Sequence, residues 1–302
     1  ILIVSIAQTF GNPARAALLP SIVPRESFPR AVTIASTVQA LAFVSGPTAC
    51  GFVIAAAGIG AVYGAYEFLA AGSLVGLAFL RPAAAEGARR AMSWEAVRSG
   101  LAYVRRQPVV LGCMTLDMFA VIFGGATALL PIYATEILQV GARGYGVLSA
   151  SLEAGALVSA IAMLALPPIR RAGAALLVAV AVYGVATIVF GLSQWFPLSV
   201  AAYALVGVAD QVSVVMRGTA IQLSTPDELR GRVSSVNFLF IGASNQLGAV
   251  ESGFVAALTS APFAVVSGGV GCLIVVAVVA ATLPALRAYR LDDPSTAGLT
   301  TQ

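Results

Sequence analysis

The sequence predicts an all-α integral membrane protein built from long transmembrane helices. Hydrophobic residues make up 59% of its 302 residues and charged residues only 10%, with a mean hydropathy of +0.93. Soluble domains carry about 25% charged residues, and they cannot hide this much apolar surface in one core. The apolar residues gather in stretches of about 20–27 residues, long enough to cross roughly 30 Å of hydrocarbon at 1.5 Å per residue.

Nine such stretches follow one another along the chain. They lie near residues 1–23, 31–56, 60–80, 108–133, 145–166, 173–193, 197–223, 232–258 and 263–286. The chain opens on Ile1, inside the first stretch, without an initiator methionine or the charged start of a signal peptide. We therefore expect the sequence to be a piece of a longer protein.

The arginines predict the sidedness of these helices. All 17 basic residues are arginines, and 14 of them lie in the connections after the first, third, fifth, seventh and ninth stretches. The intervening connections hold only Arg143, and Arg15 and Arg217 lie within stretches. Because positive charge marks cytoplasmic loops, the arginine-rich connections and the C-terminus are predicted to be cytoplasmic.

Composition also excludes several classes of function. The arginines are not gathered in one segment, which argues against nucleic-acid binding. The absence of histidine excludes histidine-based catalysis and metal binding, and there is no P-loop that would indicate ATP as the driving force. Cys50, Cys113 and Cys272 are far apart in apolar stretches and are interpreted as packing residues. We expect no cofactor, no metal and no enzymatic activity.

The first two stretches are repeated 202 residues later in the same orientation. In this register the aligned pairs are Arg15 with Arg217, Pro24 with Pro226, Glu26 with Glu228, Arg30 with Arg232 and Gly46 with Gly248. Shared apolar composition does not produce such a register of charged residues, prolines and glycines. The repeat predicts two parallel halves of six helices each. Residues 108–287 form the complete second half, and three helices of the first half would precede Ile1.

Three segments resemble the major facilitator superfamily, in its drug and siderophore exporter branch, the enterobactin-exporter-like group. They read GNPARAALLPSIVPRESFPRA, SGPTACG and TPDELRGRVSSVNFLFIGASNQLG. The resemblance covers the whole chain and implies a two-bundle helical fold with nine of twelve transmembrane helices present. It assigns residues 1–80 to the N-terminal bundle, 81–107 to a cytoplasmic linker, 108–287 to the C-terminal bundle and 288–302 to a cytoplasmic tail.

The segment SGPTACG resembles the antiporter motif of that superfamily. Gly46, Pro47 and Gly51 match the motif, whereas Cys50 stands where a glycine is usual. Glycines let a neighbouring helix approach closely, and a proline frees a carbonyl and kinks its helix. The resemblance implies a bend that favours export. Packing of small residues in any helical membrane protein is the alternative.

The cytoplasmic junctions carry their own signals. Thr225, Pro226 and Glu228 predict a helix start with Thr225 as the N-cap. The pairs Glu26–Arg30 and Glu228–Arg232 have a spacing of four residues, which suits a helical ion pair. They are interpreted either as capping and topology signals or as a latch that breaks during transport. Residues 93–107 predict an amphipathic helix that lies at the membrane interface and links the halves.

Ionisable residues within the stretches are the candidates for function, because a charge in the bilayer is costly. The resemblance implies a central cavity lined by the stretches 1–23, 108–133 and 197–223. Asp210 and Asp117 are the candidates for proton coupling, and both could instead form structural pairs between helices. The candidates for the substrate cavity are Gln8, Asn12, Arg15, Ser213 and Arg217. Glu67, Glu153 and Glu251 are weaker candidates.

Together these features predict a secondary transporter of a bacterial inner membrane, a monomer that exchanges protons for a small amphiphilic solute. Sidedness and spans follow from the residues, whereas export, proton coupling and solute class follow from the resemblance. The alternatives are an importer or uniporter of the same fold, or a scaffold or sensor that no longer transports. Without three helices, we expect this piece alone not to transport.

Overall fold

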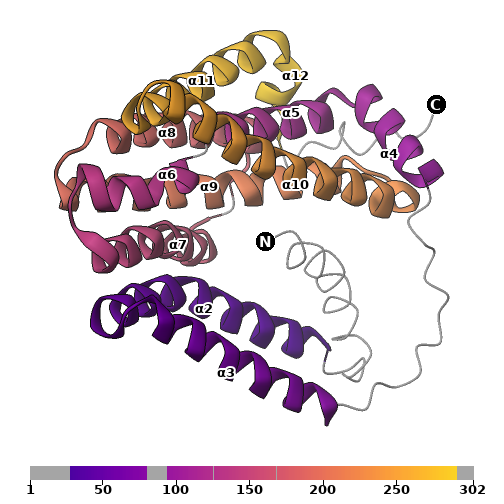
Figure 1. The fold of residues 1–302 in the computed structure, drawn as a ribbon. Coiled ribbons are helices and arrows are strands. Elements are labelled where there is room, and N and C mark those ends of the chain that lie inside the picture. The colour runs from indigo at the N-terminus through magenta and orange to yellow at the C-terminus, as the bar shows by residue number, and fades with distance from the viewer. Residues whose placement is uncertain (1–27, 80–93, 125, 168, 291–302) are drawn as a thin grey trace. The chain divides into compact units, whose positions relative to one another are not determined.

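The fold is known from a computed structural model, which describes residues 28–79, 94–124, 126–167 and 169–290. All regular structure in these residues is helical, which confirms the predicted all-α class. The chain divides into two compact units, Ile1–Ala91 and Met92–Gln302 (Figure 1). The first predicted stretch, residues 1–23, lies outside the described residues.

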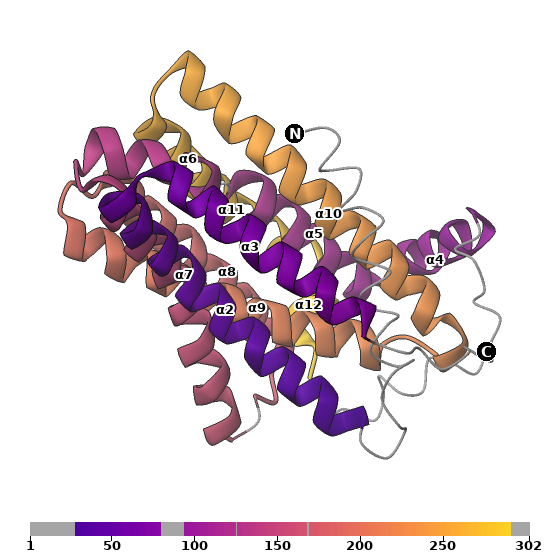
Figure 2. The ribbon, with the colours of Figure 1, turned by 60° about the horizontal axis from the view of Figure 1, so that its bottom comes forward.

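The first unit contains two long helices, α2 (Phe28–Ala57) and α3 (Ile59–Ala78), which lie side by side and antiparallel (Figures 1 and 2). Gly58 joins them with a backbone φ of 79°, a conformation that glycine adopts without strain. Its N–H bonds to the Ile54 carbonyl at 2.9 Å and so ends α2. A single residue therefore reverses the chain between two helices of this unit.

The Gly-Pro pair lies inside α2, and the helix continues through it. Pro47 has no N–H to give to the preceding turn, and just before it Ser45 Oγ bonds to the Leu41 carbonyl at 2.7 Å. Gly51 is buried, whereas a Cβ on Gly46 would meet no described atom within 4 Å. The predicted role of this segment in an export-favouring bend stays a prediction.

The second unit is a bundle in which α9 (Phe196–Leu223) is central. It packs between α7 (Gly141–Ala165) and α8 (Ala172–Leu192), and α11 (Ala261–Thr282) packs on α8. Figure 2 shows α10 (Asp227–Leu258) running along α5 (Pro108–Phe123) and α4 (Trp94–Arg106). The short helix α12 (Pro284–Ala288) packs on α8 and α5.

Six segments of the described residues are long and apolar enough to span a membrane. They are Ile59–Gly76, Pro108–Ile137, Gly141–Ala165, Ala172–Leu192, Phe196–Leu223 and Ala261–Thr282. Their bounds agree with six of the nine predicted stretches to within a few residues. Helices α2 and α10, with 30 and 32 residues, cover two more. The protein is therefore a multi-pass membrane protein.

Helices α7 and α9 cross at two glycines that the sequence analysis did not single out. A Cβ on Gly155 would lie 2.0 Å from the Ala204 carbonyl oxygen, and one on Gly207 would lie 1.9 Å from that of Leu152. Main-chain atoms occupy both positions, so the two backbones are in direct contact. Small residues hold membrane helices together by permitting this approach.

Replacing Gly207 by alanine is expected to lower the free energy of unfolding by roughly 1–3 kcal/mol, because a methyl group forces the two backbones apart. Gly218→Ala, on the same helix, is the matched control: a Cβ there meets no described atom within 4 Å. It should leave stability unchanged or raise it through helix propensity. Thermal unfolding of both variants in detergent measures the difference, and equal behaviour would contradict the close crossing.

The stretch predicted as one helix at 108–133 is interrupted, which corrects that expectation. Helix α5 ends at Phe123, α6 (Ala126–Ile132) follows, and a π-helical turn, η2 (Tyr133–Ile137), completes the segment. The Tyr183 hydroxyl bonds to the Gly124 carbonyl at 3.0 Å, and Cys272 Sγ bonds to the Ala120 carbonyl at 3.3 Å. Both carbonyls also accept a main-chain N–H at 2.7 Å, from Ala126 and Gly124 respectively, so each has two donors at the break. The polar backbone is thus satisfied here, as a membrane-embedded segment requires.

Helix α4 covers the residues predicted to form an amphipathic linker helix. Its place at the membrane interface stays a prediction, and the structure adds that part of its apolar side packs on protein. Val104 is 1% exposed in the core that α4 shares with α5 and α10. A Cβ on Gly100 would lie 2.8 Å from the Arg232 carbonyl oxygen, so α4 touches the α10 backbone. The apolar side of α4 around Val104 is therefore covered by protein.

A hydrogen bond also ties α4 to the end of α9. The Tyr103 hydroxyl donates to the Ser224 carbonyl at 2.5 Å. Partial burial raises the pKa of Tyr103, while a hydrogen bond with Gln107 opposes the shift. The phenol thus remains a donor at neutral pH, and it fixes α4 to the end of α9 within the second unit.

The predicted cap of α10 is wrong by one residue. The helix begins at Asp227 with Pro226 at the N-cap position, where the Pro226 carbonyl accepts from Leu229 and Arg230 at 3.0 Å each. Thr225 Oγ1 bonds backward to the Ile221 carbonyl in α9 at 2.6 Å. The hydroxyl thus satisfies the end of the preceding helix and leaves the next helix uncapped by a side chain.

Candidate functional site

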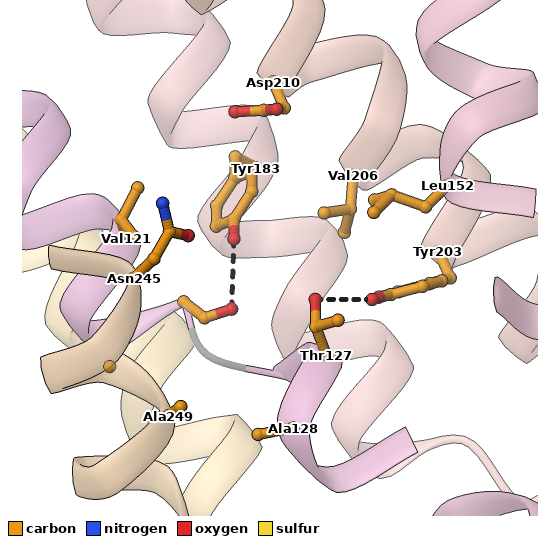
Figure 3. Close-up of a pocket in the computed structure, with 12 residues that line it drawn as sticks. Val121, Thr127, Ala128, Leu152, Tyr183, Tyr203, Val206, Asp210, Asn245 and Ala249 are labelled. Carbon is orange, nitrogen blue, oxygen red and sulfur yellow. Dashed lines mark hydrogen bonds between the residues drawn. The ribbon is translucent and has the colours of Figure 1, made fainter. Parts of the chain in front are cut away.

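The candidate site is a cavity of about 210 Å³ within the second unit, bordered by the helix break between α5 and α6 (Figure 3). Its lining residues come from six helices. They are Val121, Gly124, Thr127, Ala128, Leu152, Tyr183, Tyr203, Val206, Asp210, Asn245, Gly248 and Ala249. The walls are mostly apolar, and Asp210 is the one acidic residue among these lining residues.

Asp210 lies on α9, is solvent-exposed and lines the cavity. Tyr183 lies beside it but directs its hydroxyl away, toward the Gly124 carbonyl (Figure 3). That hydroxyl donates to a main-chain oxygen and has no second proton to offer Asp210. The Tyr183 hydroxyl is therefore engaged by the Gly124 carbonyl rather than by the Asp210 carboxylate.

Glu153 on α7 is the second acidic residue at this site. It is half-buried and lies close enough to Asp210 and Tyr203 to interact electrostatically with both. The close crossing of α7 and α9 at Gly155 and Gly207 brings the two helices together here. The sequence analysis ranked Glu153 low because its helix was not expected to line the cavity.

An aromatic and hydroxyl layer supports the cavity wall. The Tyr203 hydroxyl and Thr127 Oγ1 are 2.9 Å apart, which ties α9 to α6 (Figure 3). The Phe190 ring packs against Tyr203 and Tyr133, with centroid distances of 5.0 and 4.6 Å. The Tyr133 hydroxyl donates to the Gly191 carbonyl at 2.9 Å. This layer holds the short helix α6 in place after the break.

Arg217 and Asp117 form an ion pair between α9 and α5. Their side chains are 7% and 10% exposed, so the pair is buried. Neither residue lines the cavity around Asp210. The sequence analysis placed Asp117 among the coupling candidates and Arg217 among the cavity candidates, and it also considered a structural pair between helices for Asp117. The structure joins the two residues to each other.

The other predicted site residues are placed as follows. Ser213 is buried on α9, between Asp210 and Arg217. Gln8, Asn12, Arg15 and Glu26 lie outside the described residues, and of Arg30 only the helical backbone is described. At the second junction, Glu228 and Arg232 are exposed, and Arg232 Nη1 donates to Ser99 Oγ in α4 at 3.1 Å. That contact joins α10 to the linker helix.

Several residues of the cavity carried no signal in the sequence. Tyr183, Tyr203 and Thr127 are ordinary components of apolar stretches, and their roles depend on hydrogen bonds between helices. Gly248, which the repeat pairs with Gly46, lies where a Cβ would be 2.7 Å from the Val121 carbonyl oxygen. The repeat register was thus the one signal that pointed to this close approach of α10 and α5.

Comparison with known proteins assigns the chain to a family. Residues 1–297 match the family described as transmembrane secretion effector, within the major facilitator superfamily. The chain belongs to this family. The match is consistent with the all-α, multi-pass architecture described above.

Two relatives of this transmembrane secretion effector are the proteins named enterobactin exporter EntS in Escherichia coli O1:K1 / APEC and in Escherichia fergusonii. Each is 26% identical over 289 residues, covering 95% of this chain and 68% of the relative. The family description and these names indicate a membrane transporter rather than an enzyme. They confirm the predicted family and the multi-pass membrane class.

Proposed function

We propose that this chain is part of a proton-coupled exporter of small amphiphilic solutes in a bacterial inner membrane. The observation that carries the proposal is the exposed carboxylate of Asp210 at a cavity with largely apolar walls. The direction of transport is supported by the family description and by the relatives that are named exporters.

The proton would bind at Asp210, with Glu153 as its neighbour. Two nearby carboxylates repel each other when both are ionised, and a bound proton relieves that repulsion. A cationic or hydrogen-bonding group of a solute would relieve it in the same way. Competition between proton and solute for one carboxylate is a direct route to their exchange.

The solute would contact the aromatic and aliphatic part of the cavity. Tyr183, Tyr203 and Val206 supply apolar surface, while Asn245 supplies an amide near the same opening. Ligand sites are commonly 300–1,000 Å³, so a cavity of about 210 Å³ suits one part of a solute. The second bundle would thus supply one wall of a larger site.

Transport would proceed by alternating access, in which the two halves rock about the solute site. In this proposal Gln8, Asn12, Arg15 and Ser213 contribute to the solute path. The segment with Gly46, Pro47 and Gly51 bends to favour export. The ion pair of Asp117 and Arg217 fixes α5 to α9 within the second bundle, which then moves as a unit.

The junction residues would act at the cytoplasmic side. Glu26 and Arg30 in one half correspond in the repeat to Glu228 and Arg232 in the other. Arg232 bonds to Ser99, so this junction connects α10 to the linker helix. We assign the junctions to control of access on the side that carries the C-terminus, and a monomer suffices for the mechanism.

Everted inner-membrane vesicles that carry the full-length protein test this function. Energised vesicles should accumulate at least one of three probes: ethidium, norfloxacin or enterobactin. A protonophore should abolish the accumulation, and vesicles without the protein are the control. Accumulation that resists the protonophore would contradict proton coupling. Probe loss from the vesicles on energisation would indicate import, and probe binding without flux would indicate a scaffold or sensor.

A further inference from the structure

A second cavity, which shares no lining residue with the cavity around Asp210, is lined by three arginines. Arg171 lies directly before α8, Arg287 lies in α12, and Arg290 follows it. The cavity measures about 340 Å³, and its other lining residues are Ala174 and Ala288. Three guanidinium groups therefore border one hollow.

Close packing of two segments builds this cavity. The Gly173 N–H donates to the Tyr289 carbonyl at 3.2 Å, and a Cβ on Gly173 would lie 1.7 Å from the Leu286 carbonyl oxygen. Leu286 and Tyr289 are 0% and 4% exposed. Each buried anchor is followed directly by one of the cavity arginines, so the packing that holds α12 on α8 also brings Arg287 and Arg290 to Arg171.

The cavity lies at one end of the membrane-spanning helices. The span of α8 begins at Ala172 and that of α11 ends at Thr282, so both neighbouring spans terminate here. Beyond the cavity, the same two helices expose apolar side chains, with Val178 62% and Val278 53% exposed. A basic hollow at the level of the lipid headgroups thus adjoins apolar surface at the level of the acyl chains.

Guanidinium groups bind phosphate oxygens through paired hydrogen bonds, and basic pockets at a membrane surface attract anionic headgroups. We propose that Arg171, Arg287 and Arg290 form a binding site for the phosphodiester headgroup of an anionic phospholipid. The acyl chains lie along the exposed apolar residues of α8 and α11. The site is separate from the solute cavity and does not depend on the proposed export function.

Thermal unfolding of the purified full-length protein in a neutral detergent tests the site. Dioleoyl-phosphatidylglycerol should raise the melting temperature in a saturable manner, because a ligand that binds the folded state stabilises it. Dioleoyl-phosphatidylcholine should not. The double variant Arg171→Gln/Arg287→Gln should require about tenfold more phosphatidylglycerol for the same shift.

The matched control is Arg105→Gln/Arg106→Gln, which removes two exposed arginines outside the cavity and should respond like the wild type. Equal weakening in both double variants would overturn the site in favour of diffuse attraction. An equal response to the neutral lipid would also overturn it. Inorganic phosphate that competes with the lipid would overturn a lipid site in favour of a free-anion site. If the double variant does not fold, the phosphatidylglycerol requirement of the single variant Arg287→Gln is compared with that of the wild type instead.

Discussion

Replacing Asp117 by asparagine is expected to lower the free energy of unfolding by roughly 3–5 kcal/mol, the cost of leaving one partner of a buried ion pair uncompensated. The substitution keeps the size of the side chain and removes its charge. Arg217 would then be a guanidinium that is only 7% exposed, on a helix inside the bilayer, without its counter-charge. Unfolding of the purified protein in increasing sodium dodecyl sulfate measures the change.

A second variant separates the ion pair from the packing around it. Replacing both residues, as in Asp117→Leu/Arg217→Met, removes both charges and keeps most of the buried volume. Since a buried ion pair often contributes little more than apolar residues of the same size, this double variant should recover most of the lost stability. A single Asp117→Asn variant as stable as the wild type would contradict the buried pair.

Asp210→Asn is expected to abolish proton-driven accumulation of the solute and to leave its downhill exchange in place. Asparagine has nearly the shape of aspartate but cannot bind and release a proton. The cavity and its aromatic wall would remain, because Asp210 is exposed and the hydrogen bonds of the wall join Tyr183 to Gly124 and Tyr203 to Thr127. Solute counterflow and gradient-driven accumulation, measured in the same vesicles, separate the two activities.

The control for this variant is Glu251→Gln on α10. It removes one half-buried carboxylate that does not line the cavity and whose neighbour Ser252 donates to it at 3.3 Å. Accumulation should persist in this variant. A loss of accumulation in both variants would show a general dependence on acidic residues rather than a site at Asp210.

Much of the fold could be predicted because the bilayer imposes simple rules. Length and hydropathy located the spans, and the agreement is closest for α8 and α9, which begin and end near polar or aromatic residues. The interruption after Phe123 could not be predicted in this way. Both halves of that segment are apolar, and the groups that contact the break from other helices, Tyr183 and Cys272, donate to Gly124 and Ala120 across long sequence separations.

Only the charged residues of the site could be predicted from the sequence. Asp210, Asp117 and Arg217 stood out because charges are rare within spans. Which of them pair depends on the rotation of α5 and α9 about their axes, and this rotation is set by packing across the whole bundle. Glu153 was underrated for the same reason: its helix meets α9 at Gly155 and Gly207, a crossing that no spacing of charged residues indicates.

The bonding of Thr225, whose predicted cap was misplaced, and the packing of the linker helix α4 both depend on contacts between helices. Local signals define which groups can bond, but not which of two available partners they choose. Thr225 bonds to α9 behind it, and the apolar side of α4 around Val104 packs on protein. Both choices depend on where α9, α10 and α4 meet.

Proton release on solute addition tests the central claim most directly. Full-length wild-type protein and Asp210→Asn would be reconstituted at equal density into liposomes that contain the pH dye pyranine, and the solute identified in vesicles would be added without any other energy source. The account predicts a proton flux in the wild type and none in Asp210→Asn, with Glu251→Gln like the wild type. A proton flux of the same size in Asp210→Asn would contradict the claim that this carboxylate couples protons to export.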